Sequence, residues 1–325
     1  MCAQWFGNIG KISLPTPFPV GDVNVYVVKG DKLTLFDAGI NTKEGWDTFV
    51  FELSQLGYTP EDIEQIILTH HHPDHVGLLD YFSEDVDVFA HEGAERWTVR
   101  TDDFQQVCHD FYRKSFTQFG LPRDPEPVIR QMQAPLKFSC KGRSLTSYLK
   151  EGDRLPGLEE WLAIETPGHS QSHLVFYREK DGIMIVGDHV LATVSSNPLL
   201  EPPRKPDMER PKPQVQYNDS LKKVLQFPVE KAFTGHGTEV SKMHDLIDRR
   251  LGRQHERAMS VKEMLKDEPR TAFEVCKQLF PAIYKKQPDL TISESVGQLD
   301  YLLELGEITV HQNDNDILYF SAKRS

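Results

Sequence analysis

Apolar and polar positions alternate in short blocks along roughly the first 240 residues, and the blocks predict strands and helices in turn. Residues 23–37 contain two β-rich runs separated by the polar turn KGDK, which predicts a hairpin. Residues 43–57 place apolar side chains at helical spacing, and Thr59 followed by Pro60 predicts the start of another helix. The apolar runs IEQIILT and VDVFAH predict two further strands, separated by a helix over HVGLLDYF. This alternation indicates an α/β fold.

Two segments interrupt the alternation. We predict a helical insertion over about 95–150, because FQQVCHDFYRKSFTQFG and the stretch after the next proline-rich turn have helical character. Strands resume with LAIETPGHS, HLVFYRE and GIMIVGDHVL. Residues 195–216 contain six prolines and are not expected to form a regular helix or a central strand. A helix is expected again from Tyr217 onward.

The character of the chain changes once more near residue 242. A long amphipathic helix, a shorter helix capped by Thr271 and a third helix over 291–306 precede two strands around the turn NDND. Three helices and a terminal hairpin are typical of a small winged-helix module. In a chain of 325 residues, which is long for one core, we therefore expect an α/β domain over 1–241 and a winged-helix-like domain over 242–325.

The stretch LTHHHPDHVG, residues 68–77, holds four of the 13 histidines. Crowded imidazoles repel one another once they are protonated, and a bound cation removes that conflict. His70 and His72 are two apart in an extended turn, so their rings can share one side, whereas Asp74 and His75 begin a helix and can face a second point. Because neutral imidazole and carboxylate are metal ligands, this one loop can begin two adjacent metal sites.

Three later strands end in a polar residue beside glycine: His169 in TPGHS, Asp188 in VGDHV and His236 in TGHG. Each alone is typical of an ordinary turn. In α/β proteins, however, ligands bind where strands end at one sheet edge, so these residues and the cluster together predict a metal centre. Among the neighbouring histidines, we expect His71 to point away from the metals and His173 to pack or to support the ligands.

The order His-x-His-x-Asp-His, then Pro-Gly-His, Gly-Asp and Gly-His-Gly resembles the metallo-β-lactamase superfamily of hydrolases, over about residues 10–240. The resemblance implies a four-layer αβ/βα sandwich with metals at one edge, and a catalytic role for the first domain. It assigns metal 1 to His70, His72 and His169, metal 2 to Asp74, His75 and His236, and the bridge between them to Asp188. It also matches Asp37, in FDAG, to a strand-end aspartate near the metal loop.

The C-terminal module narrows the resemblance to the lactamase-β-2-like group, whose mammalian member is an endoribonuclease. YNDSLKKVL followed by GHG also looks like that group. The insertion at 95–150 and the proline-rich segment at 195–216 are longer than a minimal member needs, and both are expected near the metal edge. The substrate of that group is therefore not carried over.

The complete ligand set predicts a dinuclear site, and its N and O ligands favour zinc, with manganese or iron as alternatives. Two such cations can hold a bridging hydroxide, which is a nucleophile at neutral pH. Asp74 can also orient this hydroxide. Tyr217 can donate a hydrogen bond to the substrate oxygen, or it can instead be a packing residue at the start of a helix.

Composition limits the partners. Hydrophobic residues make up 38% and charged residues 26%, as in ordinary globular proteins, and the net charge of −12 disfavours nucleic acid. Four scattered cysteines favour a reducing cytosol over a disulfide framework. We expect no signal peptide and no transmembrane helix, and hence a cytoplasmic protein without a membrane partner.

Three functions compete: hydrolysis of a small ester, thioester or lactone-like substrate, cleavage of RNA or another phosphodiester, and a non-catalytic metal-bound sensor. Residues 291–306 contain three acidic residues and no lysine or arginine, which disfavours phosphate binding and suits domain packing or a homodimer. Basic residues over 247–257 are more typical of a solvated helix face. The intact ligand set disfavours the sensor, so a small-molecule hydrolase is preferred.

Overall fold

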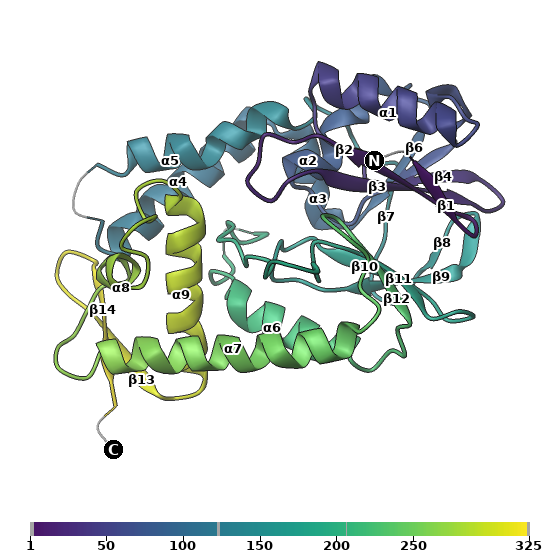
Figure 1. Ribbon diagram of the computed structural model, residues 1–325. Coiled ribbons are helices and arrows are strands. Elements are labelled where there is room, and N and C mark those ends of the chain that lie inside the picture. The colour runs from purple at the N-terminus through teal and green to yellow at the C-terminus, as the bar shows by residue number, and fades with distance from the viewer. Residues whose placement is uncertain (1–2, 122–123, 206, 324–325) are drawn as a thin grey trace. The chain divides into compact units, whose positions relative to one another are not determined.

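The computed structural model describes residues 3–121, 124–205 and 207–323, and the chain divides into two units (Figure 1). Unit 1 comprises Met1–Thr101, Pro135–Ser196 and Lys223–His244, and unit 2 comprises Asp102–Ala134, Asn197–Lys222 and Asp245–Ser325. The chain passes from unit 1 to unit 2 for the last time between residues 244 and 245, close to the domain boundary expected between 241 and 242. Most of the predicted insertion's helices and of the proline-rich segment also belong to unit 2. One cut in the chain therefore does not separate the units, because contacts join segments that are distant in sequence.

Unit 1 is built on two β-sheets. The first has seven strands in chain order: β1 (Gln4–Phe6), β2 (Ile9–Leu14), β3 (Val23–Lys29), β4 (Leu33–Phe36), β5 (Gln65–Ile67), β6 (Asp87–Ala90) and β7 (Ser147–Tyr148). The second has the order β12-β11-β10-β9-β8, with β8 (Arg154–Leu155), β9 (Leu158–Glu165), β10 (Leu174–Arg178), β11 (Ile183–Gly187) and β12 (Lys231–Thr234). β3 and β4 form the predicted antiparallel hairpin. β1 and β2 were not predicted.

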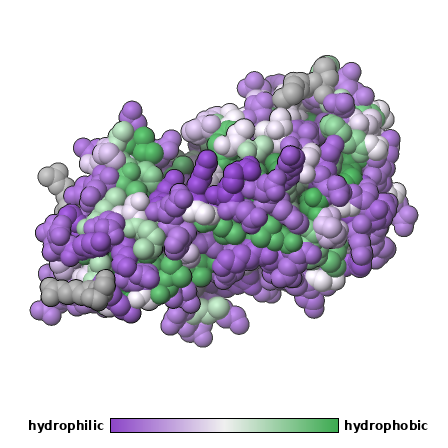
Figure 2. All heavy atoms as spheres, turned by 60° about the horizontal axis from the view of Figure 1, so that its bottom comes forward, coloured by the Kyte–Doolittle hydropathy of each residue, from purple (hydrophilic) through white to green (hydrophobic). Residues whose placement is uncertain are grey.

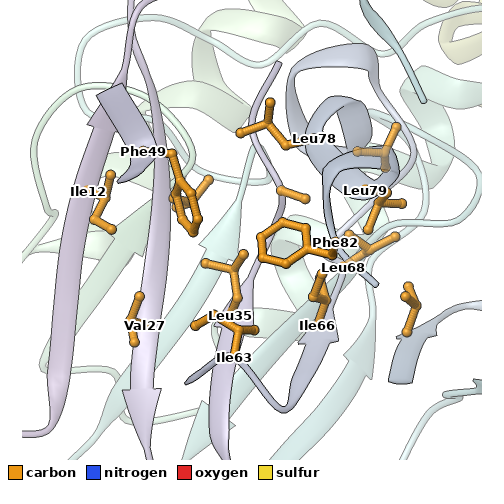
Figure 3. Close-up of a cluster of buried hydrophobic side chains, with 14 of the residues drawn as sticks. Ile12, Val27, Leu35, Phe49, Ile63, Ile66, Leu68, Leu78, Leu79 and Phe82 are labelled. Atoms are coloured by element: carbon orange, nitrogen blue, oxygen red, sulfur yellow. The ribbon is translucent and has the colours of Figure 1, made fainter. Parts of the chain in front are cut away.

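Strands β3 and β4 are buried on both faces because alternate side chains enter different cores. Val27 and Leu35 belong to a core that also contains Phe49 of α1 (Lys43–Gln55), as Figure 3 shows. Tyr26 and Phe36 belong to a second core with residues of the other sheet: Trp161, Phe176, Ile185 and Phe233. The first sheet therefore packs against helices on one face and against the second sheet on the other.

Local sequence explains how the helices of unit 1 begin and end. The Thr42 hydroxyl caps α1 by accepting a hydrogen bond of 2.9 Å from the backbone N–H of Gly45. The helix expected after Thr59 is only a 3₁₀ turn, η1 (Pro60–Asp62), although its capping box forms, because β5 follows almost at once. The predicted helix over HVGLLDYF is two short pieces: α2 (Pro73–Val76) and η2 (Gly77–Tyr81). α3 (Glu92–Val99) follows β6.

The remaining elements lie wholly or mainly in unit 2, apart from η3 (Ala134–Phe138). They are α4 (Asp102–Gln118), α5 (Glu126–Gln133), α6 (Pro213–Val224), α7 (Met243–Met264), α8 (Ala272–Leu279), α9 (Pro288–Glu304), β13 (Ile308–Gln312) and β14 (Leu318–Ala322). Thr271 caps α8 as predicted. α6 begins four residues earlier than expected, because a proline is well tolerated in the first turn of a helix. The three predicted helices and the hairpin are present, and their classification as a winged helix stays a prediction.

A helix that crosses a membrane must be both long and apolar. Among the described residues, no helix combines the length and the hydropathy that crossing a bilayer requires. The face in Figure 2 is mainly hydrophilic, with hydrophobic residues in small groups.

Two helical glycines give a matched test of packing in unit 2. A Cβ on Gly252 of α7 would meet no atom within 4 Å, so Gly252→Ala should raise the free energy of unfolding by about 0.5–1 kcal/mol. A Cβ on Gly297 of α9 would lie 2.8 Å from the Gln214 Cβ, so Gly297→Ala should lower it by about 1–3 kcal/mol. Urea unfolding measures both changes, and shifts of the same sign would contradict this packing.

Candidate metal centre

Four strands deliver the predicted ligands to one edge of the sheets. β5 leads into the segment 70–75, β9 leads to His169, β11 to Asp188 and β12 to His236. β11 and β12 are parallel, and β9 runs in the same direction because two antiparallel pairings separate it from β11. Their carboxyl ends therefore meet, which brings distant segments of the chain together.

All seven predicted metal ligands lie together in the structure, in two groups of three and one residue between them. Within each group, one possible ligand atom of each residue lies within 4.8 Å of the others: His70, His72 and His169 in the first group, Asp74, His75 and His236 in the second. Asp188 joins His70 and His75 in an overlapping group. The grouping coincides with the predicted ligand sets, and their occupation by metal stays a prediction.

Asp188 lies at the centre of this arrangement. Its Oδ1 is 3.4 Å from His75 Nε2, and its Oδ2 is 3.6 Å from His169 Nε2 and 3.5 Å from His236 Nε2. Asp188 Oδ1 and His75 Nε2 are buried and make no hydrogen bond among the described residues. Buried polar atoms normally have a partner, so a carboxylate facing three imidazoles at this spacing suits a shared cation.

Asp37 fixes the orientation of His75. It follows β4 with a φ of 60°, a left-handed conformation that aspartate tolerates better than most residues. Its Oδ1 accepts a hydrogen bond of 2.7 Å from the Thr69 backbone N–H, and its Oδ2 accepts from the Thr69 hydroxyl and from His75 Nδ1, each at 2.8 Å. Because Nδ1–H donates to Asp37, a neutral His75 ring would direct its Nε2 lone pair toward the centre of the cluster, beside Asp188. Asp37 therefore lies beside the metal loop, as the resemblance implied.

Three further histidines of the predicted ligand set have an oxygen partner at Nδ1: His236 with the Asp22 carbonyl (2.8 Å), His70 with Thr69 Oγ1 (3.0 Å) and His169 with Ser196 Oγ (2.9 Å). A partner at one ring nitrogen directs the other toward the cluster. The sequence analysis missed these three partners. The position of Thr69 next to the histidine cluster could have indicated its role. Asp22 accepts through its backbone carbonyl, which side-chain patterns do not reveal, and Ser196 lies in a segment without a recognisable sequence motif.

Carboxylates and imidazoles shift one another's pKa in this buried cluster. Burial alone would lower the pKa of His75, but Asp37, Asp188 and Asp74 outweigh it and raise the pKa well above the usual value. Burial would likewise lower the pKa of His236, yet Asp188 and Asp74 raise it. Burial favours the neutral form of both Asp188 and Asp74, but the facing histidines lower the pKa of each carboxyl group. Both carboxylates are therefore charged at neutral pH.

Two glycines let the strand ends approach the cluster closely. A Cβ on Gly235 would lie 2.1 Å from Asp188 Oδ1 and 2.9 Å from His75 Cε1. Gly187 has a φ of 46°, and its Cβ would lie 2.6 Å from Thr69 Oγ1. Gly235 thus has a steric role, and Gly187 has a steric role as well as a conformational one.

Two other residues singled out from the sequence lie outside the two groups. His71 Nδ1 is 2.7 Å from Ser172 Oγ, and the His71 ring stacks on Trp97 with an interplanar angle of 4°. Tyr217 is fully buried on α6 in unit 2, where its hydroxyl interacts with Arg250. This contact fits the packing alternative, and a catalytic role for Tyr217 stays a prediction.

A family model described as the metallo-beta-lactamase superfamily matches residues 18–236 of the chain. The protein belongs to the metallo-β-lactamase superfamily. This match agrees with the paired sheets and the convergent His/Asp cluster, and it confirms the predicted α/β fold and the hydrolase class.

The similarity to known proteins covers most or nearly all of the chain. It is 43% identical over 317 residues to the probable metallo-hydrolase YqjP of Bacillus subtilis, covering 98% of this chain and 99% of that protein. It is 22% identical over 270 residues to a beta-lactamase-like protein 2 homolog of Caenorhabditis elegans, covering 82% and 73%. The crystal structure of a metallo-beta-lactamase family protein from Thermus thermophilus matches with a TM-score of 0.81 at 24% identity, covering 97% and 99%. The fold therefore extends through the C-terminal elements.

Asp37→Asn tests the anchor of the cluster. Asparagine tolerates the same left-handed backbone, but its amide nitrogen would face hydrogen-bond donors of Thr69 or His75. The free energy of unfolding of the metal-free protein should fall by about 1–3 kcal/mol. Asp87→Asn, which removes only a half-exposed ion pair with Lys32, should change it by less than about 0.5 kcal/mol. Equal effects in guanidinium titrations would show that Asp37 has no special role.

Proposed function

We propose that the protein is a metal-dependent hydrolase that holds two divalent cations and cleaves a small ester, thioester or lactone-like substrate. The observation that carries the proposal is the division of the cluster into two triads with Asp188 between them. A single cation would use only one triad and would leave the three converging donor atoms of the other triad without a metal ion.

The donor set fits such cations. Each triad offers three N or O donors, all of them buried or half-buried. We assign metal 1 to His70, His72 and His169, metal 2 to Asp74, His75 and His236, and the shared ligand to Asp188. Imidazole and carboxylate together favour zinc, and manganese or iron would accept the same donors.

When bound, a cation pair of this kind acts as a Lewis acid and brings the pKa of water toward neutrality, so that hydroxide can attack a carbonyl carbon. The charged Asp74 carboxylate can accept a hydrogen bond from the attacking water and orient it. The C–O or C–S bond of the substrate then breaks, and the leaving group takes up a proton. Because His75 and Asp188 are buried, bulk water does not compete for their ligand atoms.

Burial of α9, rather than its charge, supports a small substrate over RNA. The acidic residues of α9 that disfavoured phosphate binding are already paired: Glu294 with Arg257 at 2.7 Å, Asp300 with Arg210 at 2.6 Å and Glu304 with Lys212 at 3.2 Å. Twelve residues of α9 are buried, so the helix offers little surface to a nucleic-acid groove. The net charge of −12 adds a general repulsion.

Metal analysis followed by a hydrolysis screen tests the proposal. The purified protein should carry about two equivalents of metal and hydrolyse members of an ester, thioester and lactone panel, with loss of activity on chelation. His72→Ala and His236→Ala should each remove about one equivalent and most of the activity. The control His311→Ala alters a histidine on β13 that stacks on Tyr319 and should change neither. Metal without turnover would favour the sensor, and cleavage of short RNA alone would favour the phosphodiesterase.

Metal binding should also release protons. Without metal, Asp37, Asp188 and Asp74 raise the pKa of His75, and Asp188 and Asp74 raise that of His236, so both rings hold a proton more strongly than a free histidine does. In contrast, burial and, to a smaller extent, neighbouring imidazoles lower the pKa of His70 and His72. A cation needs the lone pairs, so binding at pH 7 should expel up to about two protons and should weaken as the pH falls. Calorimetric titration of metal-free protein with zinc in buffers of different ionisation enthalpy counts the protons. A buffer-independent heat would contradict this assignment.

A further inference from the structure

Ser196 is a buried residue in an exposed stretch of the chain. Residues 193–195 are exposed, whereas Ser196 retains 4% of its accessible surface. It lies between β11 and α6, in a stretch without regular secondary structure. Its Oγ is 2.9 Å from Nδ1 of His169, which is itself buried. A buried hydroxyl needs a partner, and this imidazole provides one.

The direction of this hydrogen bond follows from the proposed role of His169 as a metal ligand. A neutral imidazole that binds a cation through Nε2 must carry its proton on Nδ1. His169 Nε2 faces Asp188 Oδ2 at 3.6 Å, so Nε2 is the nitrogen directed at the cluster. Nδ1–H then donates to Ser196 Oγ. The serine thereby selects the tautomer and restrains rotation of the ring.

Ser196 differs from the other Nδ1 partners in where it comes from. Asp37 comes directly after β4, Thr69 lies two residues after β5, and Asp22 directly precedes β3. The first sheet therefore fixes the positions of all three partners. Ser196 instead belongs to the irregular chain that begins the proline-rich segment. Among these four hydrogen bonds, the one that orients His169 depends on a loop.

We propose that Ser196 is a positioning residue for the metal site of His70, His72 and His169, and that the start of the proline-rich segment sets the affinity of that site. This inference rests on the proposed function, because it requires that His169 binds metal. It predicts unequal sensitivity: loss of the Ser196 hydroxyl should weaken one site and leave the site of Asp74, His75 and His236 unchanged.

Ser196→Ala removes the hydroxyl without adding volume, and Ser196→Thr returns it. Ser172→Ala is a matched control, because Ser172 makes the same kind of buried contact, at 2.7 Å, with His71, which is not one of the seven predicted ligands. Zinc affinity and stoichiometry are measured on metal-free protein by competition with a chromogenic chelator, and unfolding temperatures show that each variant is folded.

In Ser196→Ala, the affinity of one of two zinc sites should fall about 10- to 100-fold, as for loss of other partners of metal-bound histidine. Ser196→Thr should recover most of it, and Ser172→Ala should match the unsubstituted protein. Unchanged zinc affinity in Ser196→Ala, or an equal loss in Ser172→Ala, would overturn the inference while the two-metal proposal stands. If the unsubstituted protein binds no zinc, manganese or iron in the triads, the proposed function fails first.

Discussion

The carboxylate of Asp37 links the fold to the candidate metal centre. It accepts one backbone and two side-chain hydrogen bonds at the end of β4, from Thr69 and His75. These bonds hold the loop after β5, which carries four of the seven predicted ligands, against the neighbouring parallel strand. A buried carboxylate with three donors is stable only where all three converge, so the pairing of β4 with β5 determines the position of the histidine cluster.

The candidate site was largely predictable because its residues are marked by local patterns. Short spacings within residues 70–75 decide which side chains can share a point, and glycine marks the strand ends that carry His169, Asp188 and His236. The steric reason for one of these glycines, Gly235, appears only in three dimensions, where a Cβ would meet Asp188. Ser196 had no such mark, since one serine in a proline-rich stretch looks like any loop residue.

Elements that depend on side-chain periodicity and capping were predicted correctly, whereas features that depend on tertiary contacts were not predicted. The β3–β4 hairpin and the Thr271 cap of α8 follow from alternation and capping chemistry. The segment after Thr59 has a complete capping box, yet its helical turn ends after three residues and β5 begins at Gln65, because pairing with β4 outweighs a local helix signal. The division into two units depends on contacts between distant segments, which no local pattern records.

The acidity of α9 has a different meaning in the structure from the one it has in the sequence. Read alone, its four carboxylates and the lack of a lysine or arginine suggest a negative surface. In unit 2, Glu294, Asp300 and Glu304 are each paired with a basic residue from α7 or from the chain just before α6: Arg257, Arg210 and Lys212. These pairs neutralise three of the four carboxylates of α9 and attach the helix to its own unit. The argument against nucleic-acid recognition by α9 therefore rests on burial rather than on repulsion, and it would hold even if the net charge of the chain were zero.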